Sequence, residues 1–198
     1  MSAPYGDPEN GSLVARCMTV DGSNIYVSAY SQNSNIATYD PANSVMPSGG
    51  VPTGNTMIYN GQGFTIGVVI VYNTSGTPLW KTLFTGTYPY SENVGVLPTS
   101  ITVGGGNVYV SGWTDTVGTP PLVSFYSTPN GTVNSGLTII NNGSFNNFVV
   151  AYNSSGKVLW VKNATAPGSS SLSIGFTGTS AYSNGLLIAS AEYEANHA

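Results

Sequence analysis

Short apolar runs alternate with polar turns along the whole chain. The stretch VVIVYNTSGTPLW, residues 68–80, is typical. Val69 and Val71 alternate as in a strand with two different faces. The sequence Asn-Thr-Ser-Gly at 73–76 favours a tight turn, because Asn bonds its own backbone and Gly accepts a left-handed conformation. With Trp80 in the returning strand, this pattern predicts a β-hairpin.

The same hairpin returns as FVVAYNSSGKVLW at residues 148–160, and we name the two copies the tryptophan hairpins. Seven positions are identical, and each lies 80 residues from its match. The fixed spacing indicates an internal repeat. Large aromatic side chains at repeated positions favour burial. We therefore expect a repeated core built on Tyr72, Gly76 and Trp80 and on Tyr152, Gly156 and Trp160.

A second kind of hairpin occurs at residues 13–31, 97–114 and 171–193. Each copy reads as a strand, a turn rich in Gly and Asn, and another strand. The matching asparagines, which lead us to name these the asparagine hairpins, are Asn24, Asn107 and Asn184. Their separations of 83 and 77 residues give the same period as the tryptophan hairpins, with small insertions and deletions.

The hairpins divide the chain into one repeat array over residues 1–198. We expect a half repeat at 12–31 and full repeats at 64–114 and 145–193. The connectors, 32–63 and 115–144, are long for structureless loops, and their apolar segments predict an extra strand or hairpin in each. The predicted fold class is all-β, with antiparallel four-stranded blade-like repeats in an incomplete array of about two and a half units.

These residues resemble the SBBP-type β-propeller repeats. The resemblance rests on Phe148, Tyr152, Gly156, Leu159 and Trp160 in one half of the motif, and on the GNVYVSG of residues 106–112 in the other. It covers most of the chain outside the connectors. The sequence departs from the pattern where the usual Asp of the asparagine hairpin becomes Gly104, and in its longer period.

The resemblance implies a β-propeller-type array, and repeats of this kind occur in large DNA viruses and in bacterial surface proteins. A propeller closes with at least about four blades. Two and a half units therefore leave open β edges, which recruit other strands. We expect other structural proteins, or copies of the same chain, as partners. The expected location is a virion, with the cell surface or the extracellular space as the alternative.

Charge is scarce: only 6% of the residues are charged, and the formal net charge is −4. Nucleic-acid binding requires a basic surface, so we expect no nucleic-acid partner. The same shortage of cations disfavours an anionic membrane surface. No apolar run is long enough for a spanning helix, and the start MSAPYGDPENGS does not look like a signal peptide. A surface with so few charges repels neighbours weakly, which suits a protein packed against others.

Residues with catalytic potential are few. His197 is the single histidine and is the next-to-last residue, which disfavours Ser–His–Asp and Cys–His catalysis. Glu192 and Glu194 share one face of a strand-like run and could hydrolyse glycosides as a carboxylate pair. Charged residues on an exposed edge strand are the favoured interpretation. Cys17 is the single cysteine and is expected to be a small buried residue.

Ligand sites are equally sparse. The oxygen-rich runs at 21–24 and 40–43 lack the ligands that calcium needs, and turns explain them. Gly104–Gly106 do not follow the strand–loop–helix pattern of a nucleotide loop. We expect no cofactor and no metal. The N-x-S/T sequons, which are frequent in a chain so rich in Asn and Ser, are at Asn10, Asn73, Asn130, Asn142, Asn153 and Asn163.

Trp113 follows Gly112 at the end of an asparagine hairpin and has no tryptophan at the matching repeat position. It is the best candidate for an exposed ring that stacks on a ligand, and a glycan is the possible ligand. The sequence thus predicts a non-enzymatic structural or interaction protein in a larger assembly. A carbohydrate-binding module and a component of a secreted or cell-surface filament are the alternatives.

Overall fold

The computed structural model describes residues 13–31, 35–37, 56–58, 66–87, 95–115, 122–127, 133–140, 145–164, 173–175, 181–183, 186–188 and 192–194. Every regular element in these ranges is a β-strand, and all the strand pairs are antiparallel. The predicted all-β class is confirmed. None of the sheets in the described part closes into a barrel.

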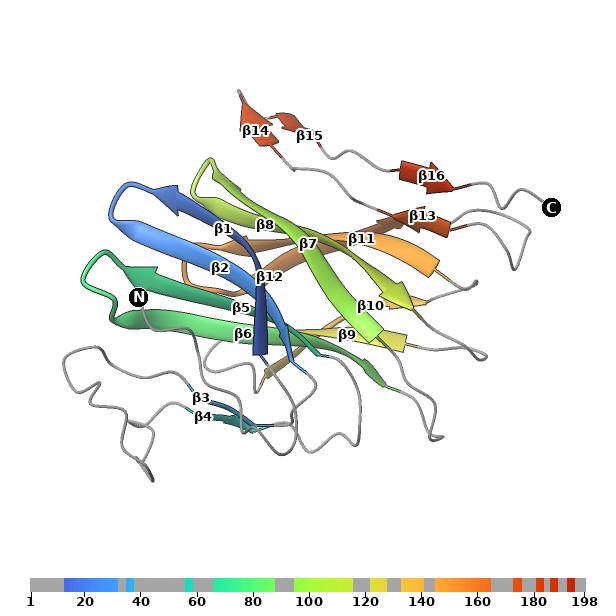
Figure 1. Cartoon of the computed structure of the whole chain (residues 1–198), viewed down its shortest axis with the longest axis horizontal. Coiled ribbons are helices and arrows are strands. Elements are labelled where there is room, and N and C mark those ends of the chain that lie inside the picture. Colours follow the sequence, from blue (N-terminus) through green and yellow to red (C-terminus); the bar gives the residue numbers. More distant parts are fainter. Residues whose placement is uncertain are drawn as a thin grey trace.

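Two sheets form the body of the molecule (Figure 1). In spatial order the larger sheet contains β1 (Leu13–Asp21), β2 (Asn24–Ser31), β5 (Ile66–Asn73), β6 (Pro78–Thr87), β9 (Leu122–Ser127) and β10 (Val133–Ile140). The smaller sheet contains β12 (Val158–Ala164), β11 (Phe145–Asn153), β8 (Asn107–Asp115) and β7 (Gly95–Gly104).

Three small sheets complete the described part. Each connector contains strands: β3 (Asn35–Ala37) pairs with β4 (Thr56–Ile58), and the other connector supplies the β9–β10 hairpin. The third asparagine hairpin consists of β13 (Ser173–Gly175) with β16 (Glu192–Glu194), and β14 (Ala181–Ser183) with β15 (Leu186–Ile188).

Hydrogen bonding joins the hairpins into two four-stranded, blade-like units. Unit 1 is β1-β2-β5-β6, and unit 2 is β7-β8-β11-β12. Each unit therefore pairs an asparagine hairpin with the tryptophan hairpin that follows the connector. The repeat expected at 64–114 does not coincide with either unit, because this segment contains β5–β6 of one sheet and β7–β8 of the other.

The two units match residue by residue. Asn24 pairs with Asn73 in unit 1, and Asn107 pairs with Asn153 in unit 2. The irregularities of the ladder also repeat. The first strand of each unit bulges at Ala15/Cys17 and at Pro98/Ser100, and the tryptophan hairpins shift register at Val71/Tyr72 and at Ala151/Tyr152. A bulge kept at the same position in both units is part of the repeated design.

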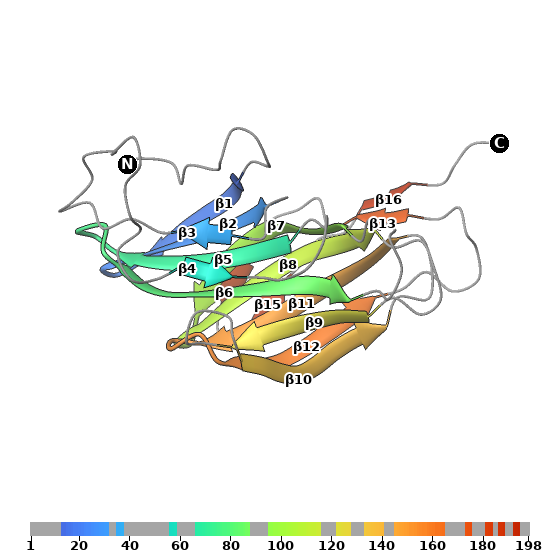
Figure 2. The same cartoon turned by 90° about the horizontal axis from the view of Figure 1, so that it is seen from below.

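The two sheets lie face to face (Figures 1 and 2). The edge strands β1 and β7 meet at one side, where the Cys17 thiol donates a hydrogen bond to the Thr99 carbonyl oxygen at 2.7 Å. At the other side β12 approaches β9, and the Val158 amide donates to the Ser127 hydroxyl at 3.0 Å. The first contact joins two edge strands, and the second joins the edge strand β12 to β9, which lies next to the edge of the larger sheet, so the core between the sheets is enclosed at its sides.

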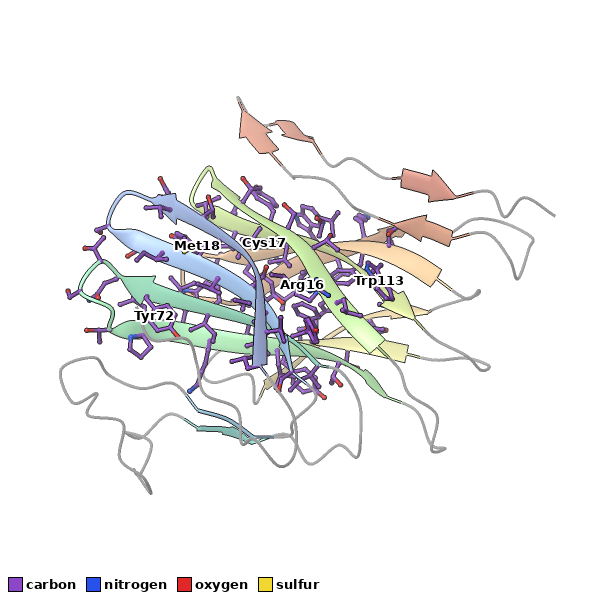
Figure 3. The ribbon with its side chains drawn as sticks, viewed as in Figure 1. Arg16, Cys17, Met18, Tyr72 and Trp113 are labelled. Carbon is purple, nitrogen blue, oxygen red and sulfur yellow. The ribbon has the colours of Figure 1, made fainter. Side chains whose placement is uncertain are left out.

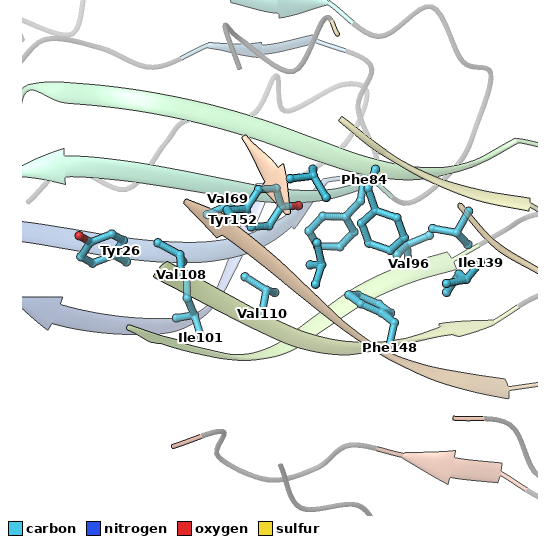
Figure 4. Packing of buried hydrophobic residues seen from close by; sticks show 14 of the residues in the cluster. Tyr26, Val69, Phe84, Val96, Ile101, Val108, Val110, Ile139, Phe148 and Tyr152 are labelled. Carbon is cyan, nitrogen blue, oxygen red and sulfur yellow. The ribbon is translucent and has the colours of Figure 1, made fainter. Parts of the chain in front are cut away.

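Three phenylalanines form the centre of this core (Figure 4). Phe84 from β6, Phe125 from β9 and Phe148 from β11 have ring centroids 5.3–5.7 Å apart. Two of the three ring pairs meet edge to face, an arrangement that aromatic quadrupoles favour. Gly67 and Gly112 make room for these rings, since a Cβ at either position would overlap a phenylalanine side chain.

The small sheets lie outside the two large ones (Figure 1). The β3–β4 pair lies beyond the outer side of the six-stranded sheet. The third asparagine hairpin lies beyond the four-stranded sheet, where β13 contacts β11 and β14 contacts β7. The third period of the sequence therefore begins to cover unit 2 from the side that unit 1 leaves open.

Candidate functional site

The turns of the tryptophan hairpins are organised by their asparagines. The Asn73 side-chain oxygen accepts a hydrogen bond from the Thr77 amide at 2.8 Å. The Asn153 side-chain oxygen accepts from the amides of Ser155 and Lys157 at 3.0 and 2.9 Å. These bonds give both asparagines a structural role in the turn that the sequence predicts.

The glycines of the same turns have the conformation that the sequence requires. Gly76 and Gly156 adopt φ angles of 84° and 79°, which side chains with a Cβ rarely adopt. The asparagine hairpins also turn through glycines, with Gly105 and Gly106 at φ 59° and 77°. Gly104–Gly106 thus connect two paired strands, unlike a nucleotide-binding loop.

Trp80 links the two units. Its indole Nε1 donates a hydrogen bond to the Ser154 carbonyl oxygen, in the turn of unit 2, at 2.9 Å. Its ring lies 6.2 Å from the Tyr152 ring, measured between centroids. Trp80 is partly buried, and the acceptor of its N–H group belongs to the neighbouring unit.

Trp160 occupies the matching place in unit 2 but has different surroundings. Its ring packs at 6.0 Å from Tyr109 of the same unit and is partly buried. Tyr109 itself matches Tyr26, and both tyrosine hydroxyls accept a 3.4 Å hydrogen bond from the asparagine two residues earlier. The local structure of the two units is therefore the same, and only the neighbour of the tryptophan differs.

Each unit has two different faces. We name the one with Trp80 or Trp160 the tryptophan face, and the other the aliphatic face. In unit 1 the tryptophan face carries Tyr26, Val69, Val71 and Phe84, and all four belong to the core between the sheets. In unit 2 that core instead takes the aliphatic-face residues Ile101, Val108, Val110, Val150 and Tyr152.

The units consequently stack with unlike faces in contact. The tryptophan face of unit 1 covers the aliphatic face of unit 2. One end of the described stack is then an aliphatic face, and the other is a tryptophan face with the third asparagine hairpin against it. In head-to-tail stacking of this kind the two ends of the array carry unlike faces, because every unit has the same orientation.

The aliphatic face of unit 1, which points away from unit 2, has an exposed apolar corner at the tip of β1. Met18 and Val20 are 57% and 58% exposed. Figure 3 shows Met18 on β1. The matches of these two residues in unit 2 are Ile101, which is 6% exposed beneath unit 1, and Val103, which is partly buried against the core. Met18 and Val20 are not among the residues predicted from the sequence. The sequence signal for them is the apolar alternation in β1, which matches that of Ile101 and Val103 in β7.

Most of the remaining aliphatic face of unit 1 is buried, and Ile25 and Val27 beside the corner are half-buried. Ala29, Ile66, Val68, Ile70 and Leu83 form a second hydrophobic cluster there, and Tyr72 packs against it. Lys81 lies on the same face and is 2% exposed, although its match in unit 2 is Val161. Burial lowers the pKa of Lys81 from 10.5 to about 8.

We expect Lys81→Met to stabilise the fold in neutral solution by on the order of 1 kcal/mol, a figure that allows for partial solvent screening. Burial disfavours the charged ammonium group. Between pH 8 and 10.5 the unfolded chain binds more protons at Lys81 than the folded chain does. Raising the pH through this window therefore stabilises the wild type relative to the variant. Urea unfolding across this pH range measures the difference.

The matched control is Lys157→Met, which removes an exposed lysine from the turn of a tryptophan hairpin. Its stability should follow the wild-type pH dependence. A Lys81→Met variant that is less stable than the wild type at pH 7, with a gap that does not change as the pH rises, would contradict the assignment.

Two further groups, the buried Tyr152 and the half-buried Cys17, have no reactive environment. Burial raises the pKa of the Tyr152 hydroxyl far above its usual range, and the described residues offer this group no hydrogen-bond partner. Burial also raises the pKa of the Cys17 thiol, which opposes formation of the nucleophilic thiolate. Neither group is prepared for catalysis.

Trp113 lies on the tryptophan face of unit 2 and is partly buried (Figure 3). It occupies the place that Tyr30 has in unit 1, where the Arg16 guanidinium lies 4.9 Å from the centre of the tyrosine ring. An aromatic ring at this position therefore belongs to the repeat. The glycan interpretation of Trp113 stays a prediction.

The other candidate residues are not brought together into a site. Glu192 and Glu194 lie in β16, opposite Gly175 and Ser173 of β13. His197 and the run at 40–43 lie outside the described residues, as do the sequons at Asn10, Asn130 and Asn142. Asn163 is exposed in β12, and Asp21 is exposed beside the first hairpin turn.

Within the described ranges no three His, Cys, Asp or Glu side chains gather as metal ligands. The described part of the chain also contains no helix that is long and apolar enough to cross a membrane. No family model matches the sequence, and no curated protein matches it either.

Proposed function

We propose that the chain is a non-enzymatic structural protein whose blade-like units pack into a larger assembly. The observation that carries this proposal is the contrast between the two units. Ile101 of unit 2 is 6% exposed because unit 1 covers it, whereas the matching Met18 of unit 1 is 57% exposed. Apolar positions that are buried by stacking at one end of the array and open at the other favour a further neighbour.

The chemistry of the surface supports the same conclusion. Arg16, Lys157 and Lys162 are exposed, and they are three of only four cations in the chain. Like-charge repulsion between neighbouring molecules is correspondingly weak. Lys81, Tyr152 and Cys17, three described groups whose pKa values burial shifts, lie in three separate places. Weak charge repulsion favours close packing, and separated titratable groups do not favour catalysis.

The setting that we propose is a virus particle, in which the chain is a minor capsid or surface protein. A filament on a cell surface is the alternative. The support is the resemblance of the hairpins to propeller repeats of large DNA viruses and bacterial surface proteins. Mass spectrometry of purified particles and of cell-envelope fractions separates the two settings by where the chain is found.

Sedimentation of the purified full chain, from dilute to concentrated solution, tests the assembly role. We expect the mean mass to rise with concentration, or the chain to bind stably to a co-purifying structural protein. A chain that stays a folded monomer throughout, and that also occurs free of any particle or filament, would disprove the proposal.

A further inference from the structure

The first asparagine hairpin, β1–β2, is attached to the rest of unit 1 by a long connector. Ser31 and Ile66 are direct partners in the β2–β5 ladder, so a turn of a few residues would suffice to join them. The chain instead uses residues 32–65, a length that spans up to about 110 Å when fully extended. We propose that two copies of the chain exchange this hairpin, so that β2 of each copy pairs with β5 of the other. The proposal rests on the assembly role proposed above and identifies the partner and the surface.

The hairpin β1–β2 can move as one element, because many of its contacts are internal. Its two strands pair with each other along their whole length, and Gly22 provides the left-handed residue of the turn at φ 57°. The Arg16 guanidinium lies 4.9 Å from the centre of the Tyr30 ring of the same hairpin. These contacts remain unchanged when the hairpin leaves its own copy.

The receiving surface consists of the edge of β5 and the part of the core beneath the hairpin (Figure 1). β2 pairs with every residue of β5, and the Thr74 amide donates a hydrogen bond to the Ser23 carbonyl oxygen at 2.9 Å. Tyr26, which is 6% exposed, and Cys17 contribute to the core between the sheets. A copy without a hairpin at this place would have an unpaired strand edge and an open core. It therefore has to take up a hairpin, either its own or that of another copy.

Exchange preserves all of these contacts, because the two copies have the same sequence. Only the path of residues 32–65 differs between the closed and the exchanged forms, and exchange of an identical element is for this reason an easy route to dimers. The connector loses entropy when its ends are held at adjacent ladder positions of one copy. Part of that loss is relieved when it runs between two copies. The scarce charge of the chain also opposes the approach of a second copy only weakly.

The second asparagine hairpin, β7–β8, is held in its own copy. Residues 88–94 join it to β6, and residues 116–121 join it to β9. Both of these strands belong to the six-stranded sheet and pair with each other there. Because two short connections anchor β7–β8 to one sheet, we expect no exchange at its pairing with β11. Unit 2 therefore provides the matched control.

Steric fit selects β5 as the strand that receives the exchanged hairpin. Ala29 of β2 pairs with Val68 of β5, whereas the matching Gly112 of β8 pairs with Phe148 of β11. A Cβ at Gly112 would lie 2.7 Å from the Phe148 ring. Ala29 carries this Cβ, so pairing of β2 with β11 would bring it against the ring. The exchange therefore joins β2 to β5 and not to the other tryptophan hairpin.

Single cysteines in different copies test the exchange. All variants carry Cys17→Ser, which removes the native thiol and places there the residue that unit 2 has at Ser100. A full chain with Ser28→Cys and a full chain with Val69→Cys are unfolded, mixed, refolded together at high concentration and mildly oxidised. The two positions are ladder partners. We expect a disulfide-linked species of twice the chain mass on a non-reducing denaturing gel.

A second cysteine pair, Val27→Cys with Ile70→Cys, occupies the neighbouring ladder position. In an antiparallel ladder one of two neighbouring pairs is the closer, non-hydrogen-bonded kind, so one of the two pairs has the favourable spacing for a disulfide. A chain that carries both cysteines of a pair shows by its loss of free thiols that this disulfide forms in the folded protein.

The control in unit 2 is Ser111→Cys with Val149→Cys, the matching ladder partners of β8 and β11. This mixture should give no linked dimer, and neither should Ser28→Cys with Val149→Cys, since β2 does not fit β11. Efficient linkage in the second mixture would refute the selection of β5.

The exchange is overturned if the chain with both cysteines forms its disulfide while the mixed single-cysteine copies give no more linked dimer than the unit 2 pair. A mean mass that still rises with concentration then leaves the assembly role intact. A chain that stays a monomer throughout, and that occurs free of any particle or filament, overturns both.

Discussion

Replacing Phe148 by alanine is expected to destabilise the folded chain by about 3–5 kcal/mol, the range for a large buried aromatic side chain. Phe148 is fully buried, and its ring meets Phe84 and Phe125 edge to face. The three rings come from two different sheets. Alanine leaves a cavity at the point where the sheets are held together, and the surrounding strands can collapse into it only partly.

Urea unfolding monitored by tryptophan fluorescence measures this loss, since Trp80 reports on the contact between the units. Leu159→Ala is the control, because it removes an aliphatic side chain from unit 2 that is 43% exposed. That change should cost at most about 0.5 kcal/mol. Equal losses for the two variants would mean that the phenylalanine cluster does not hold the sheets together.

Gly112→Ala is expected to cost about 1–3 kcal/mol, the usual penalty for overpacking a filled core. A Cβ at this position would lie 2.3 Å from the Leu97 carbonyl oxygen and 2.7 Å from the Phe148 ring. The ring can move only against the other phenylalanines. The carbonyl belongs to the backbone of the neighbouring strand, so relief requires β7 to shift.

Unit 1 supplies the reciprocal substitution, because its matching residue is Ala29. Ala29→Gly removes a methyl group that fits in unit 1. We expect it to lower the free energy of unfolding by about 0.5–1 kcal/mol, because glycine loses more backbone entropy on folding. Calorimetric unfolding of both variants gives the comparison. Gly112→Ala with wild-type stability would place Phe148 and β7 farther from Gly112 than in this structure.

The hairpins could be predicted from the sequence because their determinants are local. Asn73 and Gly76 supply the turn chemistry within a few residues, and the structure has their side-chain bond and left-handed backbone. The pairing of the hairpins has no such local determinant. β2 pairs with β5 across a long connector. The repeat period would be the same if each asparagine hairpin paired with the tryptophan hairpin before it, so the period does not determine the pairing.

The candidate surface was missed for a related reason. Met18 and Ile101 look equivalent in sequence, and only the order in which the units stack makes one exposed and the other buried. Trp80 and Trp160 differ in the same way, since only the first reaches the turn of another unit. Periodicity predicts which residues share a face of a strand. It does not predict which of two apolar faces receives a neighbour.

The pairing of β6 with β9 also determines the order in which the chain can fold. Phe84 of unit 1 lies opposite Phe125, which belongs to the connector between the strands of unit 2. During synthesis the first four strands of the larger sheet are made before β9. Until β9 is made, the edge of β6 is unpaired and Phe84 lacks its contact with Phe125. Such unpaired edges are where nascent chains aggregate or exchange strands. A chain that ends between residues 87 and 122 therefore has the β6 edge open.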